Sequence, residues 1–277
     1  MQSITSRQNP LLKQTIKLKA RKQRDKEGLY IIEGYHLLWE AVNGGVPLRH
    51  VFFQETPCGA PLRESRELAA ALEEKGVFTA CLPPELFALA AEAETPQGVL
   101  AAAEKPRAAG DWFPRDRRQG GGNVLVADRI QDPGNMGTLI RTADAAGCLG
   151  MIVLKGTVDV YSPKVVRSAA GSLFRLPLLF LDTPEQALKI LRENGKRSVC
   201  TGPCCDVYYY DVDMRENVAL IIGNEGEGAC RAFMEGADVS VKIPMAEGTE
   251  SLNAAVAAGV LLYESVRQRS KKMVPMK

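Results

Sequence analysis

Hydrophobic and polar positions along the chain follow two different spacings. Short runs rich in apolar and β-branched residues predict buried strands. Between most of these runs, apolar residues recur every three or four positions, which is the spacing of an amphipathic helix. Strands that alternate with helices favour an α/β fold with a mainly parallel sheet.

The first part of the chain is predicted to form one compact α/β domain. Its strands are expected at residues 28–33, 50–54, 77–82 and 98–102. Its helices are expected at residues 9–24, 35–43, 62–75 and 84–91. Gly44 and Gly45 follow the second of these helices and are typical of a helix end.

A second α/β domain is predicted after a segment that is rich in Gly, Pro and Arg and has no periodicity. That segment, residues 104–122, is interpreted as a linker, so the domains are expected at 1–103 and 123–277. In the second domain, strands are expected at 123–128, 151–154, 198–201, 218–222 and 239–243. Helices are expected there at 135–146, 163–170, 184–194 and 251–269.

Composition narrows the class of protein. A chain of 277 residues with 45% apolar residues can bury a full core and is long enough for two domains. No run reaches the roughly 18 apolar residues that span a bilayer, and the N-terminus does not resemble a signal peptide. We therefore expect a cytoplasmic protein with no membrane partner.

The seven cysteines are odd in number and irregularly spaced, which argues against a disulfide framework. Cys200, Cys204 and Cys205 lie close together but lack the paired spacing of a zinc site, and the two histidines are distant in sequence. No metal is expected.

The net charge of +2 is unevenly distributed. Residues 1–28 are strongly basic, and further basic clusters lie at 115–118 and 267–272. Such tracts favour a nucleic-acid partner, although a solvated helix face is the alternative. The candidate RNA contacts in the first tract are Arg7, Asn9, Lys17, Arg21 and Arg24.

A glycine-rich loop follows the apolar run 218–222. Gly223, Gly226 and Gly228 predict a tight turn at the end of a buried strand, where open α/β sheets bind ligands. Glu225 and Glu227 would repel a pyrophosphate, so an uncharged or cationic ligand fits better. The alternative is a plain turn whose glutamates face water.

The segment 132–147 is predicted to pass from a turn into a helix. Asn135 is the expected N-cap. Arg141 lies off the apolar stripe and can hold a phosphate with two hydrogen bonds, although a solvated arginine is the alternative. The stripe itself consists of Met136, Leu139, Ile140, Ala143 and Gly147.

Three segments match a known family in order and spacing: Asn135-x-Gly137-x-x-x-Arg141, then Ile222-Gly223-Asn224-Glu225-Gly226-x-Gly228, then Ile243-Pro244-Met245 with Ser251-Leu252-Asn253. The chain therefore resembles the SpoU (TrmH) family of the SPOUT superfamily, whose members are RNA 2′-O-ribose methyltransferases. Residues 6–10, 32–34 and 95–100 also resemble that family's ribosomal-protein-like α/β/α substrate-binding domain.

The resemblance implies a C-terminal parallel-sheet α/β domain with a deep trefoil knot that binds S-adenosylmethionine. It implies the following cofactor-binding residues: Thr201, Gly202, Gly223, Asn224, Gly226, Ile243, Met245, Ser251 and Leu252. The implied catalytic residues are Arg141, Asn135, Glu225, Ser251 and Asn253. We interpret Arg141 as a clamp on the phosphate and ribose hydroxyl. A guanidinium keeps its proton at neutral pH and therefore cannot accept another one as a base. The proton then leaves with help from Glu225, the phosphate or water.

The resemblance also implies a homodimer formed through the knotted domain and the final helix, and an RNA contact at Arg167. Ribosomal RNA is the expected target. The alternatives are a tRNA ribose methyltransferase and a catalytically silent RNA-binding assembly factor. A nucleotide-dependent oxidoreductase is disfavoured, since no G-x-G-x-x-G follows the first strand of the second domain.

Overall fold

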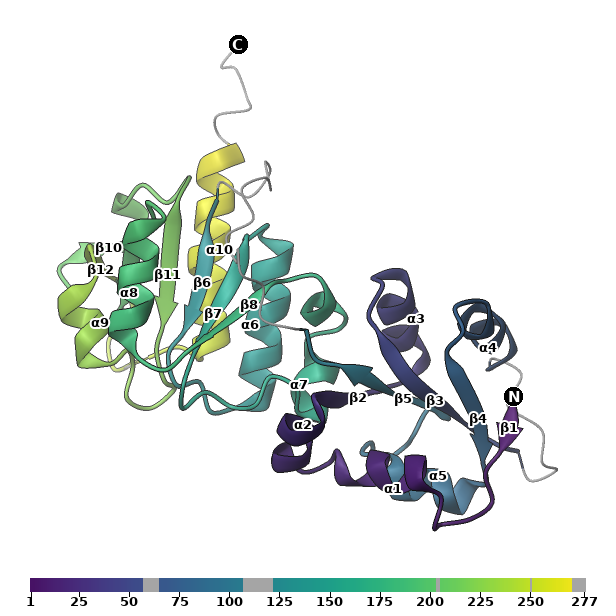
Figure 1. Cartoon of the computed structure of the whole chain (residues 1–277). Coiled ribbons are helices and arrows are strands. Elements are labelled where there is room, and N and C mark those ends of the chain that lie inside the picture. The colour runs from purple at the N-terminus through teal and green to yellow at the C-terminus, as the bar shows by residue number, and fades with distance from the viewer. Residues whose placement is uncertain (57–64, 107–121, 203–204, 250, 271–277) are drawn as a thin grey trace. The chain divides into compact units, whose positions relative to one another are not determined.

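The computed structural model describes residues 1–56, 65–106, 122–202, 205–249 and 251–270 (Figure 1). These residues form two compact units. The first holds the described residues before 107 together with 159–174, and the second holds the remainder. None of the described helices is both long and apolar enough to cross a bilayer.

The first unit is built on a five-stranded mixed sheet with the order β1-β4-β3-β5-β2. Its strands are β1 (Gln2–Ser3), β2 (Leu29–Glu33), β3 (Leu48–Gln54), β4 (Phe78–Leu82) and β5 (Val99–Glu104). Its helices are α1 (Pro10–Lys17), α2 (Arg21–Glu27), α3 (Tyr35–Asn43), α4 (Ser65–Glu74), α5 (Pro84–Ala90), α7 (Pro163–Ser168) and the short 3-10 helix η1 (Ser172–Phe174). Phe52, Phe87 and Leu100 belong to its buried core.

The single helix predicted over 9–24 is wrong, because the segment forms two helices. The Arg24 guanidinium donates hydrogen bonds to the carbonyls of Leu18 (2.7 Å) and Lys19 (2.6 Å), just after α1 ends. These bonds satisfy carbonyl groups that would otherwise accept backbone amides if the helix continued.

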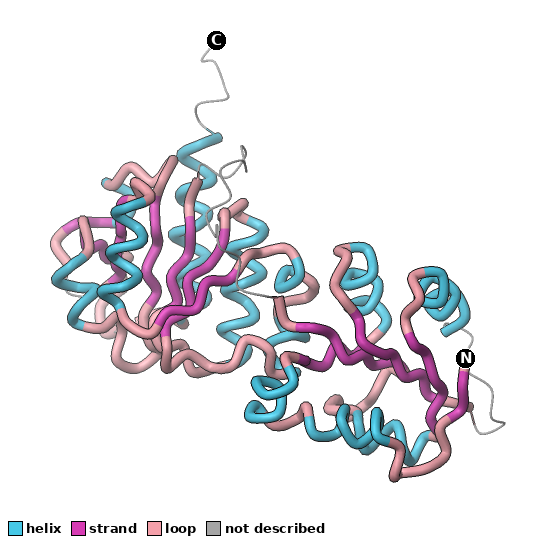
Figure 2. Tube along the Cα trace, viewed as in Figure 1, coloured by secondary structure: helices cyan, strands magenta, loops and turns pink. Residues whose placement is uncertain are grey.

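The second unit is built on a seven-stranded sheet, whose strands are drawn in magenta in Figure 2. Every pair of neighbours in it is parallel, and the order is β10-β12-β9-β11-β6-β7-β8. Its strands are β6 (Val124–Ala127), β7 (Gly150–Leu154), β8 (Leu178–Leu181), β9 (Arg197–Thr201), β10 (Val207–Tyr208), β11 (Val218–Ile222) and β12 (Val239–Lys242). Its helices are α6 (Pro133–Ala145), α8 (Pro184–Glu193), α9 (Arg231–Gly236), α10 (Ala254–Ser270) and the 3-10 helix η2 (Tyr209–Asp211). The predicted α/β class with a parallel sheet is confirmed.

Several elements of the second unit were not predicted. Strand β8 lies at the sheet edge and is only partly buried. Its four residues are all apolar, so the sequence lacks the alternation that would predict a half-buried strand. Strand β10 has two residues and helix α9 has six. Elements this short carry too few residues to show a period.

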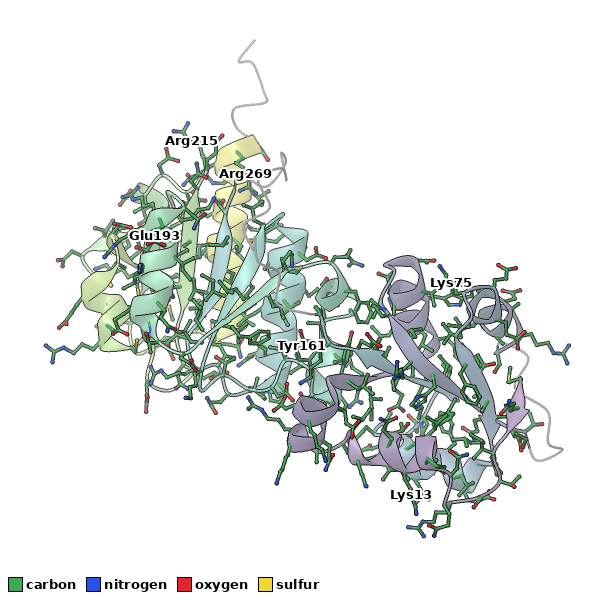
Figure 3. The ribbon with its side chains drawn as sticks, in the orientation of Figure 1. Lys13, Lys75, Tyr161, Glu193, Arg215 and Arg269 are labelled. Atoms are coloured by element: carbon green, nitrogen blue, oxygen red, sulfur yellow. The ribbon has the colours of Figure 1, made fainter. Side chains whose placement is uncertain are left out.

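Residues 159–174 associate with the first unit, although the sequence placed the helix at 163–170 in the second domain. Asp159 forms an ion pair with Arg24 at 2.7 Å, and the Tyr161 ring lies 5.1 Å from that of Tyr30, centroid to centroid. Figure 3 labels Tyr161. Most of the predicted linker, including the basic cluster at 115–118, lies outside the described residues. The boundaries 1–103, 104–122 and 123–277 stay a prediction.

Candidate functional site

A cavity of about 330 Å³ opens at the carboxyl ends of β9, β11 and β12 in the second unit. Neighbouring parallel strands end at one edge of the sheet, so the loops after them converge there. Every residue predicted to bind the cofactor lines this cavity, namely Thr201, Gly202, Gly223, Asn224, Gly226, Ile243, Met245, Ser251 and Leu252. Glu225, Glu227 and the first residues of α10 also line it.

The glycine loop, residues 223–228, has a conformation fixed by its own backbone and by Asn224. Asn224 and Gly228 exchange two backbone hydrogen bonds of 3.0 and 2.9 Å. The Asn224 side-chain oxygen accepts hydrogen bonds from the amides of Gly226 and Glu227, both at 2.9 Å. A Cβ atom at Gly223 would overlap the backbone of Gly228 and Ala229, so only glycine fits. The loop thus lines the cavity as well as forming a turn.

The Glu225 carboxylate holds the turn that precedes α6. It accepts hydrogen bonds of 3.0 Å from the amides of Gln131 and Asp132 and from the Asn135 side chain. Partial burial acts to raise the pKa of Glu225, but these hydrogen bonds outweigh it and lower that pKa. Glu225 is therefore a charged hydrogen-bond acceptor at neutral pH.

Asn135 and Asn253 continue this chain of polar contacts to the third motif. The Asn253 side-chain amide donates to the Asn135 oxygen at 2.8 Å. Its own oxygen accepts from the amide of Ala255 at 2.9 Å and caps α10. The Glu225–Asn135–Asn253 chain joins all three sequence motifs.

The prediction of Asn135 as the N-cap of α6 is wrong. The helix begins at Pro133, and the Asp132 carboxylate accepts the Asn135 amide at 2.8 Å as the cap. The Asn135 side chain is thereby free to bond Glu225 and Asn253. The predicted apolar stripe is borne out at Met136, Leu139, Ile140 and Ala143, which are fully buried.

Arg141 lies on the exposed side of α6 and does not line the cavity. Its guanidinium makes no hydrogen bond or ion pair with another described residue, in contrast to Arg129 and Arg175 in the same unit. Ser251 lines the cavity and is exposed. These two side chains are available to a ligand or substrate.

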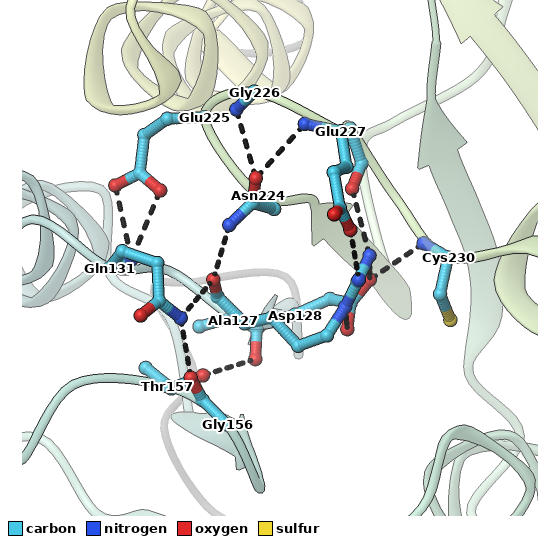
Figure 4. A network of polar contacts seen from close by, with 12 residues as sticks. Ala127, Asp128, Gln131, Gly156, Thr157, Asn224, Glu225, Gly226, Glu227 and Cys230 are labelled. Atoms are coloured by element: carbon cyan, nitrogen blue, oxygen red, sulfur yellow. Dashed lines mark hydrogen bonds and ion pairs between the residues drawn. The ribbon is translucent and has the colours of Figure 1, made fainter.

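Sequence reasoning missed a second network, which links the turn after β6 to the glycine loop (Figure 4). The Arg129 side chain contacts Glu227 at 2.6 Å, and the Asp128 carboxylate accepts the Cys230 amide at 2.7 Å. Gln131 donates to the carbonyls of Arg129 and Gly156. The signal in the sequence was position, since Asp128 ends the predicted strand 123–128, and Arg129 and Gln131 follow it.

Cys200 and Cys205 are buried, and Cys204 lies outside the described residues. Within the described ranges, no cluster of His, Cys, Asp or Glu is arranged to hold a metal ion.

In the first unit, the predicted RNA contacts divide into exposed and structural residues. Arg7, Lys17 and Arg21 are exposed, and Arg7 and Lys17 line a hollow of about 380 Å³ with Lys13. Arg24 is only 4% exposed, and its ion pair and carbonyl contacts make it a core residue, so its prediction as an RNA contact is wrong. The Asn9 oxygen caps α1 through the amides of Leu11 and Leu12.

Arg167 lies on α7 and is half-buried. Its Nη1 atom is buried and forms no hydrogen bond within the described structure.

Both parts of this architecture are similar to known protein families. Residues 122–263 match the SpoU rRNA Methylase family, and residues 9–101 match the MRM3-like substrate binding domain. The 23S rRNA (guanosine(2553)-2'-O)-methyltransferase RlmP of Bacillus subtilis is 34% identical, over 95% of this chain and 98% of its own. The 23S rRNA (uridine(2479)-2'-O)-methyltransferase of Streptomyces viridochromogenes is 36% identical, over 96% of this chain and 92% of its own.

Among solved structures, the AdoMet-bound rRNA methyltransferase of Sinorhizobium meliloti superposes with a TM-score of 0.84 at 30% identity. The match covers 96% of this chain and 97% of that one. Fold, site and relatives together define the class as S-adenosylmethionine-dependent RNA 2′-O-ribose methyltransferases. The chain belongs to the SpoU rRNA methylase family.

Proposed function

We propose that this protein methylates a ribose 2′-hydroxyl of ribosomal RNA at the cavity formed by the three motifs. The observation that carries the proposal is the Glu225–Asn135–Asn253 chain, which joins the motifs beside a cavity lined by the predicted cofactor residues. The two relatives described above are 23S rRNA 2'-O-methyltransferases whose target nucleosides differ, a guanosine in one and a uridine in the other. Their similarity to this chain supports ribosomal RNA as the substrate class. We place the reaction in the cytoplasm.

The cavity suits S-adenosylmethionine in size and in charge. Its volume of about 330 Å³ falls within the range of small-molecule sites, and the described residues of its wall include no lysine or arginine. Its charged side chains are the carboxylates of Glu225 and Glu227, which tolerate a sulfonium cation better than a phosphate. When bound, the cofactor supplies an electrophilic methyl group. Backbone groups of the glycine loop and of the loops after β9 and β12 would hold it.

The chain's own residues must orient the ribose and assist proton loss from the 2′-hydroxyl. Arg141 is exposed and unpaired among the described residues, so its guanidinium can donate two hydrogen bonds to the phosphate next to the reactive ribose. Glu225 has a lowered pKa and its carboxylate is already occupied by three donors, so it is a poor proton acceptor. We therefore assign Glu225 to positioning Asn135, and the proton to water or to the RNA phosphate.

RNA would also bind the first unit. Arg7, Lys13 and Lys17 line one hollow, and none of the described residues that line it is acidic. Such a group of cations attracts phosphate without reading sequence. Arg21 and Arg167 remain further candidate contacts.

A homodimer and a trefoil knot are part of the proposal. The face of α10 that carries Val256 (52% exposed) and Tyr263 (53% exposed) offers apolar area that a second copy can cover. The two residues lie seven positions apart, on one side of the helix. Structural similarity to the AdoMet-bound Sinorhizobium enzyme supports the knotted topology that the family resemblance implies.

The test combines cofactor binding with mapping of the methylated nucleotide. We expect calorimetric titration to give micromolar binding of S-adenosylmethionine. We also expect label from the methyl group to enter unmodified ribosomal RNA and not tRNA. Arg141→Ala should keep cofactor binding and lose transfer. Binding without transfer to either RNA would favour the silent assembly factor, and transfer to tRNA alone would favour the tRNA enzyme.

A further inference from the structure

Arg129 has a backbone conformation that is unusual for a residue other than glycine. It follows Asp128 in the turn after β6, and its φ of 57° lies in the left-handed region. A side chain in that region carries a steric cost, so such residues persist where surrounding contacts hold them.

The Arg129 guanidinium holds one end of the glycine loop. It contacts the Glu227 carboxylate at 2.6 Å and donates to the Gly228 carbonyl at 3.2 Å. On its other side it donates to Asp128 at 3.1 Å. Asp128 is only 1% exposed and also accepts the Cys230 amide just after the loop. The hydrogen bond with Asp128 leads the causes that raise the pKa of Arg129, so the guanidinium stays charged.

The Arg129 carbonyl holds the other end of the loop. It accepts a hydrogen bond of 2.9 Å from the side-chain amide of Asn224, whose oxygen in turn fixes the amides of Gly226 and Glu227. Side chain and carbonyl together bind Asn224, Glu227 and Gly228, which all line the cavity. Arg129 itself does not line it.

We propose that Arg129 is a positioning residue for methyl transfer, which holds the glycine loop in the conformation that accepts the cofactor. The inference rests on the proposed function. It differs from a surface ion pair of small effect, because Arg129 bonds the loop at both ends and also pairs with a buried carboxylate.

Two variants separate the contributions of Arg129. Arg129→Gly removes the guanidinium but adopts a left-handed φ without strain, so the carbonyl contact to Asn224 can persist. Glu227→Gln removes only the exposed end of the network and leaves Asp128 paired. Arg231→Ala is the matched control, since it removes a 2.6 Å ion pair with Glu235 on α9, away from the cavity lining.

The measurements are the Kd for S-adenosylmethionine by calorimetry, KM and kcat for methyl transfer, and the melting temperature. We expect Arg129→Gly to raise Kd and cofactor KM by about tenfold, because small misplacements of a binding loop are costly. Glu227→Gln should raise Kd by about threefold. Arg129→Lys keeps a cation that can pair with Glu227, so its Kd and cofactor KM should rise less than those of Arg129→Gly. Arg231→Ala should match the unmodified protein.

A purely structural role would lower the melting temperature of Arg129→Gly and leave Kd and KM unchanged, and that result would overturn the proposal. If Arg129→Gly does not fold, an unchanged Kd in Glu227→Gln would overturn it instead. Failure of the unmodified protein to bind the cofactor would refute the proposed function, which is a separate outcome.

Discussion

The Asn253 side-chain amide donates a hydrogen bond of 2.8 Å to the Asn135 oxygen, across 118 positions of sequence. With its other end, Asn253 caps α10, whose first residues line the cavity. A single side chain therefore links the start of the last helix to the turn that Glu225 holds. Helix stability and site geometry can be separated at this residue by substitution.

Asn253→Ala should lose both roles and Asn253→Asp only one. Alanine removes the cap, at a cost of about 1 kcal/mol in the free energy of unfolding. Aspartate keeps the capping oxygen but places an acceptor against the Asn135 oxygen. We expect both variants to lose methyl transfer and only the alanine variant to lose stability in urea titrations. Full activity in Asn253→Asp would contradict the role given to the Asn135 contact.

Gly223→Ala should abolish cofactor binding. Its Cβ would overlap the backbone of Gly228 and Ala229, which cannot move without opening the loop. Overpacking of this kind costs about 1–3 kcal/mol of stability. Gly259→Ala is the control, because Gly259 lies on α10, does not line the cavity, and its added Cβ would meet no described neighbour within 4 Å. Calorimetric titration of both variants with S-adenosylmethionine checks the prediction, and equal affinities would refute it.

Stability should depend on the charge of Glu225. Its pKa is lowered in the folded protein from a usual value of 4.5. Its contribution is therefore fully present above about pH 4.5 and is lost as the pH falls through the lower folded value. We expect the difference in unfolding free energy between the unmodified protein and Glu225→Gln to shrink between neutral and acidic pH. A difference that stays constant with pH would show that the carboxylate charge is not involved.

Arg24 should be a stability residue of the first unit. Removal of a partner from a buried ion pair costs about 3–5 kcal/mol, and Arg24→Ala would also free the carbonyls after α1. Arg21→Ala, which removes an exposed contact with Asp25, should cost about 0.3–0.5 kcal/mol. Thermal unfolding of the two variants gives the comparison. A larger effect at Arg21 would reverse the assignment.

Val256→Asp should convert a dimer into a monomer. A carboxylate on the exposed apolar face of α10 would have to be desolvated in the interface. Phe180→Asp is a fitting control, since Phe180 is equally exposed (52%) but lies on the edge strand β8. Light scattering measures the mass of each. A dimer that survives Val256→Asp would place the interface elsewhere.

The sequence by itself determined the α/β class, most strands and helices, and the loops that line the cavity. This is because local patterns such as the apolar run of β11 and the stripe of α6 report directly on burial. The resemblance of the three motifs to the SpoU family implied residues that the fold brings to one edge of the sheet. The pattern of residues alone indicated one of these loops, the glycine loop after the apolar run 218–222, because parallel sheets bind ligands at the ends of their strands.

Only the tertiary structure decided how individual side chains are used. On α10, Val256 and Tyr263 are exposed, whereas Ala258, Leu261 and Leu262 are buried. Residues 254–263 of this helix are all apolar or glycine, so the sequence there has no polar face to mark the orientation of the helix. Asn135 is not the predicted cap, and Arg24 is not at the surface. The sequence could not show this, because their partners, Asn253 and Asp159, are distant in sequence. Hydrogen bonds and ion pairs form between neighbours in space, and a sequence pattern records only neighbours along the chain.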